Sequence, residues 1–248
     1  MTTLRLIGPG RAGRSFASAL AASGWRVLPP LGRGDDLSGA ARGCDWVLVA
    51  VPDRSIAKVA AGVEPVASTV VAHLSGSCSP DVLAPHPRRA AVHPLLALPE
   101  PEVGARLLRS GAWFGVGGDP AAADLVAALG GRAVPVADED RAAYHAAACV
   151  ASNLLVALLD QAYRLAAQAG MPPAALLDLV RGTVDNVAAL GPAGALTGPV
   201  ARGDWATVES HRRAVAALGD ADLAGYDAMA ALAGRLAGHR AGVEVPCA

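Results

Sequence analysis

The chain of 248 residues has a formal net charge of −1 at pH 7, and it contains no block of basic residues. This balance argues against nucleic acid as a partner, and the length is sufficient for one large domain or two small ones. The four cysteines have no C-x-x-C spacing, so we expect a reducing, cytoplasmic setting without disulfides or a bound metal.

The first half of the sequence alternates short apolar runs with Ala-rich helical runs. The predicted strands are Leu4–Ile7, Trp25–Leu28, Trp46–Val51, Thr69–Leu74, Ala90–Val92, Trp113–Val116 and Ala133–Val136. The predicted helices between them are Ser15–Ser23, Ser55–Gly62 and Ala121–Leu129. Continuous apolar strands that alternate with helices are typical of a doubly wound α/β sheet, covered on both faces.

Strand signals stop after Val136, and the rest of the sequence has helical periodicity. The acidic run Asp138–Asp140 suits the start of a helix, and Gly170 with Pro172 suits its end. The predicted elements are a long helix over 141–169, helices over about 173–190, 204–218 and 221–237, and a loose tail at Ala241–Ala248. The sequence therefore predicts two domains, 1–137 and an all-α domain over 138–248.

The stretch Ala142–Leu159 is long and mostly apolar, as a membrane span would be. Its polar residues His145, Ser152 and Asn153 favour a buried helix instead, because polar side chains are costly inside a bilayer. We therefore expect no membrane partner. The apolar character of the helical half favours a homodimer.

The first predicted strand is followed directly by a G-x-G-x-x-G turn and then by a helical run. The turn reads Gly8-Pro9-Gly10-Arg11-Ala12-Gly13. The first glycine allows a tight bend, the second lets a pyrophosphate approach the backbone, and the third lets the helix pack closely on the strand. The helix N-terminus offers free N–H groups to the phosphates. The turn predicts dinucleotide binding; the alternative is an ordinary glycine-rich turn.

An arginine near the end of the second strand indicates NADP(H) as the cofactor. An acidic residue about 20 positions after the glycines holds the ribose 2′-hydroxyl of NAD, whereas an arginine there suits the 2′-phosphate of NADP. Counting from Gly13 gives Arg33. Asp35 and Asp36 remain candidates for a ribose contact, and a solvated loop charge is the alternative for Arg33.

The residues that end the predicted strands are candidate contacts, because ligands of open α/β sheets lie beyond the carboxyl ends of the strands. Val51 and Pro52 end the third strand and should line the cofactor cleft. Ser75 and Gly76 follow the fourth, where a hydroxyl and N–H groups would hold a substrate carboxylate or carbonyl. His93 ends the fifth strand, either as a substrate contact or as a histidine satisfied by the backbone.

Polar side chains follow one face of the predicted long helix, whose other residues are mostly Ala, Leu and Val. They are His145, Cys149, Ser152, Asn153 and Asp160. Because buried polar groups need partners, this stripe faces either a site or its own hydrogen-bond network. In a site, His145 would protonate the alkoxide formed by hydride transfer to a carbonyl, Asn153 would orient the oxygen, and Ser152 would assist.

A second group of polar residues lies further along the helical half. Arg202 would clamp a substrate carboxylate bidentately, with a solvated position as the alternative. Asn186 and Thr197 precede it and are candidate substrate contacts as well. Asp204 is best explained as the N-cap of the following helix.

The order of these motifs resembles that of β-hydroxyacid dehydrogenases, ketopantoate reductases and pyrroline-5-carboxylate reductases. It resembles more closely Rossmann-like proteins that carry the domain of unknown function 2520. The resemblance covers nearly the whole chain and rests on Gly8–Gly13, His73–Ser77, Val92–Leu95, Ala151–Asn153 and Leu196–Asp204. It implies an N-terminal Rossmann domain and a helical domain that often forms a dimer. Members linked to pantothenate synthesis imply reduction of 2-oxopantoate by NADPH.

The chain departs from this resemblance at one catalytic position. β-Hydroxyacid dehydrogenases place a lysine one turn before an asparagine on the first long helix. If Asn153 matches that asparagine, Cys149 stands at the lysine position. The only lysine of the sequence is Lys58, in the first half, so the lysine mechanism is not carried over. His145 is the replacement acid.

Three functions therefore remain open from the sequence. The first is an NADPH-dependent reductase of a small 2-oxo acid such as 2-oxopantoate. The second is an imine reductase of the pyrroline-5-carboxylate reductase type, which would need Asp160 or Asp204 near the nicotinamide. The third is a regulatory protein that binds NADP(H) without catalysis.

Overall fold

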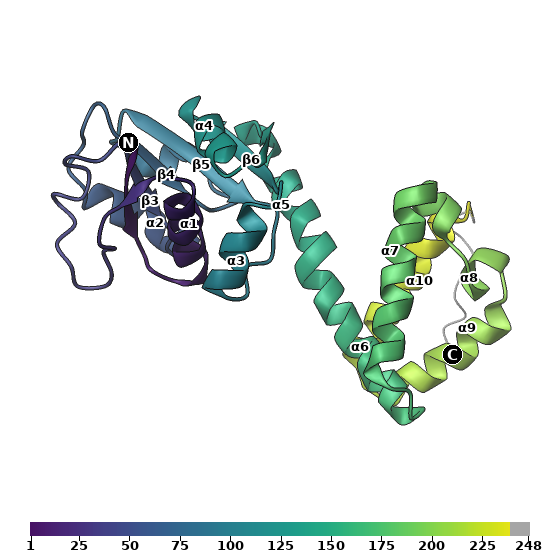
Figure 1. Cartoon of the computed structure of the whole chain (residues 1–248). Helices are drawn as coiled ribbons and strands as arrows, with labels where there is room; N and C mark the ends of the chain where they lie inside the picture. Colours follow the sequence, from purple (N-terminus) through teal and green to yellow (C-terminus); the bar gives the residue numbers. More distant parts are fainter. Residues whose placement is uncertain (239–248) are drawn as a thin grey trace. The chain divides into compact units, whose positions relative to one another are not determined.

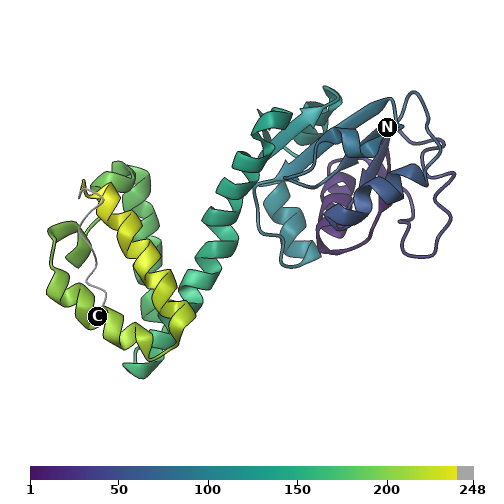
Figure 2. The ribbon, with the colours of Figure 1, turned by 180° about the vertical axis from the view of Figure 1, so that it is seen from behind.

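The computed structural model describes residues 1–238 and divides into two compact units, Met1–Ser152 and Asn153–Ala248. The first unit is an α/β domain and the second is helical (Figures 1 and 2). The predicted tail Ala241–Ala248, which contains Cys247, lies outside the described residues.

The first unit contains one seven-stranded sheet in the order β2-β1-β3-β4-β5-β6-β7. The strands are β1 Thr3–Ile7, β2 Arg26–Val27, β3 Trp46–Val49, β4 Val70–His73, β5 Arg88–Pro94, β6 Trp113–Gly118 and β7 Arg132–Pro135. The first five strands in this order run parallel, whereas β6 runs antiparallel to β5 and parallel to β7. The predicted fold class, an α/β sheet followed by an all-α region, is confirmed, with a reversed edge that periodicity did not predict.

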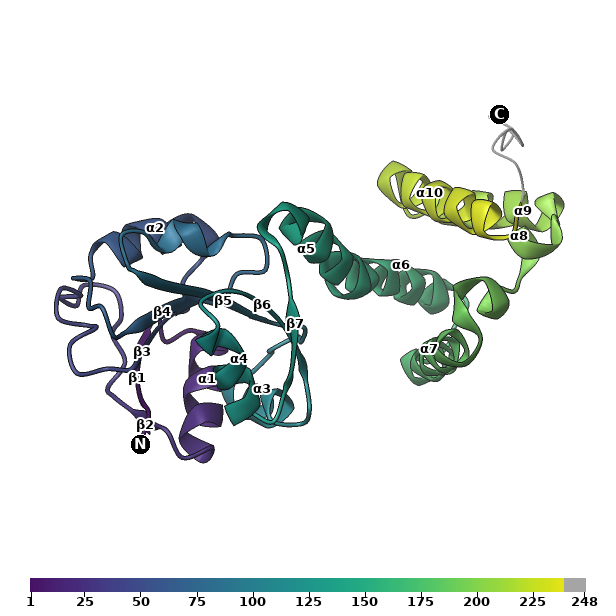
Figure 3. The same ribbon diagram turned by 90° about the horizontal axis from the view of Figure 1, so that it is seen from above.

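Helices cover both faces of the sheet (Figure 3). On one face lies α2 (Asp53–Ala61), and on the other lie α1 (Arg11–Ala22), α3 (Pro101–Leu108) and α4 (Ala121–Ala128). Strand alternation produces the two cores: Leu6 and Leu48 pack in one, Ile7 and Val47 in the other. Helix α3 and the short 3₁₀ helix η1 (Pro80–Leu83) were not predicted.

The predicted long helix is present but contains a π-helical turn. It consists of α5 (Arg141–Cys149), the π turn Val150–Leu154 and α6 (Leu155–Gln168). The sheet ends at Pro135, close to the predicted boundary at 137, yet the first unit extends through α5 to Ser152. Residues 138–152 of the predicted helical domain therefore belong to the α/β unit.

Within the described residues, the second unit continues with four helices. They are α7 (Pro173–Ala195), α8 (Pro199–Arg202), α9 (Trp205–Ala216) and α10 (Asp220–Leu236). Helices α7, α9 and α10 lie close to the predicted ranges, whereas the short α8 was not predicted. Gly191 has a φ of 70° and bends α7 directly after residue 190, where the predicted helix ends. Asp204 is the N-cap of α9, as predicted, because its carboxylate accepts the N–H of Thr207 at 3.2 Å.

The expectation that the apolar stretch Ala142–Leu159 is buried is wrong for this chain. Val150, Leu154 and Val156 are 60%, 58% and 67% exposed. Apolar composition predicts that a helix needs cover, but it does not say what supplies the cover. Asp138–Gln168 also has the length and composition of a membrane span, which is weak evidence because helices of soluble proteins can meet the same criteria.

Candidate functional site

The three motif glycines of the first turn have three different environments. Gly8 has a φ of 93°, and a Cβ there would lie 2.5 Å from the carbonyl oxygen of Ala50. A Cβ on Gly13 would collide with the carbonyl oxygen of Gly8, so α1 packs directly on the turn. Gly10 has no atom within 4 Å of its Cβ position. The turn is therefore closed at Gly8 and Gly13 and open at Gly10, as a pyrophosphate cradle requires.

The N-terminus of α1 has neither a capping side chain nor an acidic residue in its first turn. Its N-cap is Gly10. The N–H groups of Arg11, Ala12 and Gly13 therefore have no partner within the helix. Aligned N–H groups at the positive end of a helix dipole bind phosphate. These residues fit the diphosphate of a dinucleotide.

Arg33 lies beside this turn. Leu31 forms a bridge to Ile7, and its carbonyl oxygen accepts the N–H of Gly8 at 2.9 Å. The second strand is thereby continued next to β1 as far as Leu31, and the exposed Arg33 follows two residues later. This is the position from which a Rossmann-type fold reads the ribose of its cofactor.

The two aspartates that were alternatives to Arg33 are bound within their own loop. Asp35 accepts the N–H of Gly32 at 2.7 Å, and Asp36 accepts both the N–H and the hydroxyl of Ser38, at 2.9 and 3.0 Å. These hydrogen bonds, followed by the charge of Arg42, keep the pKa of Asp36 below its ordinary value. The geometry therefore favours Arg33 as the ribose-reading residue.

Val51 and Pro52 lie at the same edge of the sheet. The Val51 side chain contacts the Gly8 turn, because its Cγ1 is 2.8 Å from the position of a Gly8 Cβ. Pro52 is exposed and is the N-cap of α2. Val51 thus borders the glycine turn, and the role of Pro52 in the cofactor cleft stays a prediction.

The hydroxyl of Ser75 shapes the loop after β4. It donates to Asp53 at 2.8 Å and accepts the N–H groups of Ser77 and Cys78 at 3.2 and 3.1 Å. The hydroxyl of Ser77 also donates to Asp53, at 2.8 Å. A hydroxyl has one proton and two lone pairs, so Ser75 is fully used. Its observed role is to hold the loop, and Asp53 is a residue of this edge that sequence reasoning missed.

His73 holds the same loop from inside the sheet. It is fully buried; its Nδ1 accepts the N–H of Ser75 at 3.2 Å, and its Nε2 lies 3.3 Å from the carbonyl oxygen of Ser79. These partners require a neutral ring with its proton on Nε2. Burial is the main reason why the pKa of His73 lies below its ordinary value.

Three aromatic rings meet where the end of β5 packs against α5. The Tyr144 hydroxyl lies 2.8 Å from Nδ1 of His93, and the rings of His93 and His145 are 5.9 Å apart. Nε2 of His145 lies 3.8 Å from Sγ of Cys149. A Cβ on Gly76 would lie 2.8 Å from His145 and 2.9 Å from His93, so the missing side chain makes room for both. The first unit therefore brings three predicted residues together: Gly76, His93 and His145.

Two glycines of β6 hold the start of α5 against the sheet. A Cβ on Gly115 would collide with the Tyr144 hydroxyl, and a Cβ on Gly117 would collide with the Arg141 guanidinium. Arg141 is 3% exposed, and its Nε donates to Asp138 at 2.7 Å. Alternating glycines in a strand mark a close approach of another element. The run Phe114–Gly118 was the signal that sequence reasoning missed.

The remaining predicted residues lie elsewhere. The hydroxyl of Ser152 donates to the carbonyl oxygen of Ala148 at 2.7 Å. The other four are exposed and belong to the second unit: Asn153, Asn186, Thr197 and Arg202. Their roles as substrate contacts stay predictions. The exposed Lys58 on α2 belongs to the first unit.

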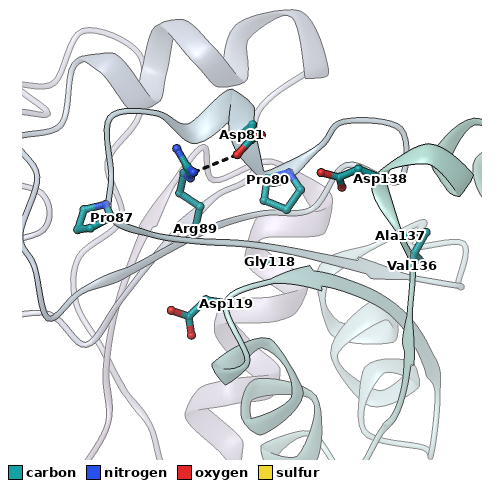
Figure 4. Close-up of a pocket in the computed structure, with 9 residues that line it drawn as sticks. All are labelled: Pro80, Asp81, Pro87, Arg89, Gly118, Asp119, Val136, Ala137 and Asp138. Atoms are coloured by element: carbon teal, nitrogen blue, oxygen red, sulfur yellow. Dashed lines mark ion pairs between the residues drawn. The ribbon is translucent and has the colours of Figure 1, made fainter.

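A cavity of about 390 Å³ lies near the start of β5, and none of the predicted site residues lines it (Figure 4). An ion pair of 3.0 Å between Arg89 and Asp81 crosses its rim. Asp119 is paired with Arg88, and Asp138 accepts the hydroxyl of Ser79. Its charged groups are thus paired with one another or with neighbouring residues.

Acidification is expected to destabilise the first unit between pH 6.5 and 4.5. Burial, followed by the charge of His145, lowers the pKa of His93 to about 4. Unfolded histidines titrate near 6.5, so in this range the unfolded chain binds protons that the folded chain does not. The contribution of neutral His93 to the free energy of unfolding is therefore fully present above pH 6.5 and is lost as the pH falls. The loss is about 2 kcal/mol for His93 alone after allowance for its partial exposure.

Urea unfolding of the wild type and of His93→Gln, at pH 7.0 and 4.5, measures this effect. The decrease in the free energy of unfolding from pH 7.0 to pH 4.5 should be smaller in the variant than in the wild type. An unfolding free energy that is the same at both pH values would contradict the assignment of neutral, buried histidines.

The comparisons with known proteins agree with this geometry. Residues 114–233 match the family described as "Domain of unknown function (DUF2520)". A solved protein of Thermotoga maritima is 26% identical, with a TM-score of 0.70 over 95% of this chain and 98% of that chain. A candidate NADP oxidoreductase from Bacteroides fragilis is 20% identical, with a TM-score of 0.78 over 94% of this chain and 98% of that one.

Pyrroline carboxylate reductase from Plasmodium falciparum, solved with NADP bound, is 13% identical, with a TM-score of 0.60 over 95% of this chain and 98% of that chain. A comparison with curated proteins gives no match. The structural similarities at low identity establish the fold. The family match includes α5, the helix that contains His145. The chain is a Rossmann-like protein that carries a DUF2520 domain over residues 114–233.

Proposed function

We propose that this protein is a cytoplasmic, NADPH-dependent reductase of a small 2-oxo acid, with 2-oxopantoate as the first candidate. The observation that carries the proposal is the position of two groups in one unit. The open glycine turn follows β1, while His93 and the loop that contains Gly76 stand at the ends of the parallel strands β5 and β4. Ligands of such sheets bind at these ends.

Different residues of the first unit would hold different parts of the cofactor. The turn Gly8–Gly13 would hold the diphosphate, Arg33 the 2′-phosphate, and Val51 with Pro52 would border the bound nucleotide. When bound, NADPH supplies a hydride to the substrate. The solved relatives from Bacteroides fragilis and Plasmodium falciparum support a nicotinamide cofactor through their names.

His145 is the proposed general acid. The carbonyl carbon gains the hydride, and the oxygen gains one proton from the imidazolium of His145, which then recovers a proton from solvent. Its ring is half-buried, packs against His93 and lies beside the thiol of Cys149. This packing holds the acid in place before the substrate arrives.

Replacing Arg33 with Ala is expected to weaken NADPH binding about 10- to 100-fold, because a charge-assisted hydrogen bond to phosphate contributes about 1.5–3 kcal/mol. NADH binding should change little. Fluorescence titration with both cofactors measures the effect. Arg26→Ala, a change of an exposed arginine on β2, is the matched control. Equal losses for NADPH and NADH would remove Arg33 from recognition of the 2′-phosphate.

We also propose that two copies of the chain associate through the helical unit. Its helices expose large apolar side chains, among them Val156, Leu179 and Leu190, each more than 60% exposed. Apolar surface of this kind marks an interface in soluble proteins. Analytical ultracentrifugation should therefore give about twice the chain mass of 24.8 kDa.

Imine reduction is the second candidate, because pyrroline carboxylate reductase is among the structural relatives. This function needs a carboxylate near the nicotinamide. Asp160 is paired with Arg164 at 2.9 Å, and Asp204 caps α9. Both carboxylates already have partners in the second unit, and Asp53, the carboxylate at the edge of the sheet, accepts the hydroxyls of Ser75 and Ser77. The carbonyl reductase is therefore the better supported function.

An NADPH-oxidation screen tests the proposal. Purified protein is assayed with 2-oxopantoate, other 2-oxo acids and cyclic imines, and the His145→Ala variant controls for contaminating reductases. Oxidation that depends on a 2-oxo acid supports the proposal. Oxidation with imines alone assigns the second candidate, and tight NADPH binding without turnover on any substrate identifies a non-catalytic binding protein.

A further inference from the structure

The hydrogen bond between Tyr144 and His93 has a definite direction. Burial raises the pKa of the Tyr144 phenol, and a hydrogen bond from the Gly115 backbone, followed by the charge of Arg141, offsets part of this rise. The phenol therefore keeps its proton at neutral pH. Among the described residues, Nδ1 of His93, at 2.8 Å, is the acceptor that lies within hydrogen-bond distance of the Tyr144 hydroxyl, so it accepts the phenol proton.

His93 is the acceptor of that proton because its ring is neutral. Burial is the main cause of its lowered pKa, and the charges of His145 and Arg141 act in the same direction, whereas the charge of Asp53 opposes them. A neutral imidazole that accepts at Nδ1 carries its own proton on Nε2. Among the described residues, Nε2 of His93 has no hydrogen-bond partner and is not one of the buried unpaired atoms. The Nε2–H group of His93 is therefore accessible from outside the protein.

We propose that Tyr144 fixes His93 as a neutral imidazole protonated on Nε2, and that this N–H donates to the carbonyl oxygen of the substrate. The inference rests on the proposed reductase function and deepens it. His93 is the catalytic residue that touches the substrate oxygen, and Tyr144 is a positioning residue that acts through His93.

This arrangement gives the two histidines different tasks. As the hydride reaches the carbonyl carbon, negative charge grows on the oxygen, and the N–H of His93 stabilises it without giving up its proton. His145 supplies the proton that converts the alkoxide into the alcohol. One hydride and one proton are thus added to the substrate, and His93 ends the cycle unchanged.

The fixed proton also selects the substrate class. A carbonyl oxygen has lone pairs that accept an N–H, whereas the nitrogen of an iminium ion has its lone pair occupied by a proton. A neutral donor therefore favours 2-oxo acids over iminium substrates. A site built around a hydrogen-bond donor discriminates strongly against a substrate that leaves the donor unpaired.

Nuclear magnetic resonance of the full-length protein, labelled with ¹⁵N-histidine and saturated with NADP⁺ at pH 7.5, tests the tautomer without any substrate. Assignment of the His93 signals uses His93→Gln. The wild type should show His93 protonated on Nε2, and Tyr144→Phe should shift the ring towards a mixture of tautomers. A wild-type His93 protonated on Nδ1, or on both nitrogens, would overturn the inference.

Kinetics with the best carbonyl substrate of the screen test the role. Tyr144→Phe should lower kcat about 10- to 100-fold, and His93→Leu by about 100-fold or more. His93→Gln should lose clearly less activity than His93→Leu, because its amide N–H₂ replaces the Nε2 donor. Adding Tyr144→Phe to His93→Gln should cost no further activity, since glutamine has no tautomer to fix.

Circular dichroism melting of each variant separates a lost function from a lost fold. Equal losses in Tyr144→Phe alone and in the double variant would show that Tyr144 is merely structural. Losses that are the same for a carbonyl and for a cyclic imine would refute the substrate selection. If no substrate is reduced at all, the proposed function fails, while the tautomer measurement still decides the assignment of His93.

Discussion

Replacing His145 with Ala is expected to lower turnover of the reductase by about 10²- to 10⁴-fold, which is the usual contribution of a positioned general acid. NADPH binding should remain unchanged, because the glycine turn and Arg33 are separate from the His145 ring in their contacts. The alkoxide would then have to take its proton from water. Stopped-flow measurement of NADPH oxidation at saturating substrate, with cofactor affinity from a parallel titration, provides both numbers.

His211→Ala is the matched control for this variant. His211 is an exposed histidine of α9 that shares a hydrogen bond of 3.1 Å with Tyr226, and no step of the proposed reaction uses it. Its removal should leave turnover unchanged. Turnover near the wild-type value in His145→Ala would exclude His145 as the acid.

Replacing Gly10 with Ala is expected to weaken NADPH binding by about 100-fold or more without lowering the thermal stability of the cofactor-free protein. The Cβ at this position meets no protein atom within 4 Å, and the backbone has an ordinary φ of −74°, so the fold tolerates a methyl group. The same methyl group would stand where the diphosphate approaches the backbone. A loss of this size corresponds to about 2.8 kcal/mol of binding free energy.

Gly8→Ala is the contrasting variant at the same turn. Its φ of 93° and the nearby Ala50 oxygen leave no room for a methyl group, so the melting temperature itself should fall. Differential scanning calorimetry and isothermal titration of both variants separate the two effects. NADPH binding to Gly10→Ala with the wild-type affinity would show that the turn is not the diphosphate site.

The sequence was sufficient to predict the parts of the molecule whose physics is local. Short apolar runs between Ala-rich helical runs located the strands, and the spacing of Gly8, Gly10 and Gly13 predicted the phosphate turn. The capping of α9 by Asp204 was predictable for the same reason, since a cap and its N–H partner lie within one helical turn.

The remainder of the site depends on contacts between distant parts of the chain. Nothing near Tyr144 in the sequence indicates that its hydroxyl meets His93, and nothing near Asp53 indicates its bonds to Ser75 and Ser77. The pairing of β6 with β5 in the reversed sense is equally non-local. The exposure of Val156 escaped prediction because hydropathy describes a side chain and not its neighbours.

The close seating of Tyr144 on Gly115 ties the evolution of these two positions together. A larger residue at position 115 would be tolerated only in a chain whose residue 144 has become smaller. A smaller residue at position 144 with glycine kept at position 115 would leave a void beneath the helix. Related sequences should therefore change the two positions as a pair. A lineage that loses Tyr144 also loses the hydrogen-bond partner of His93. Position 115 can then take a residue with a side chain.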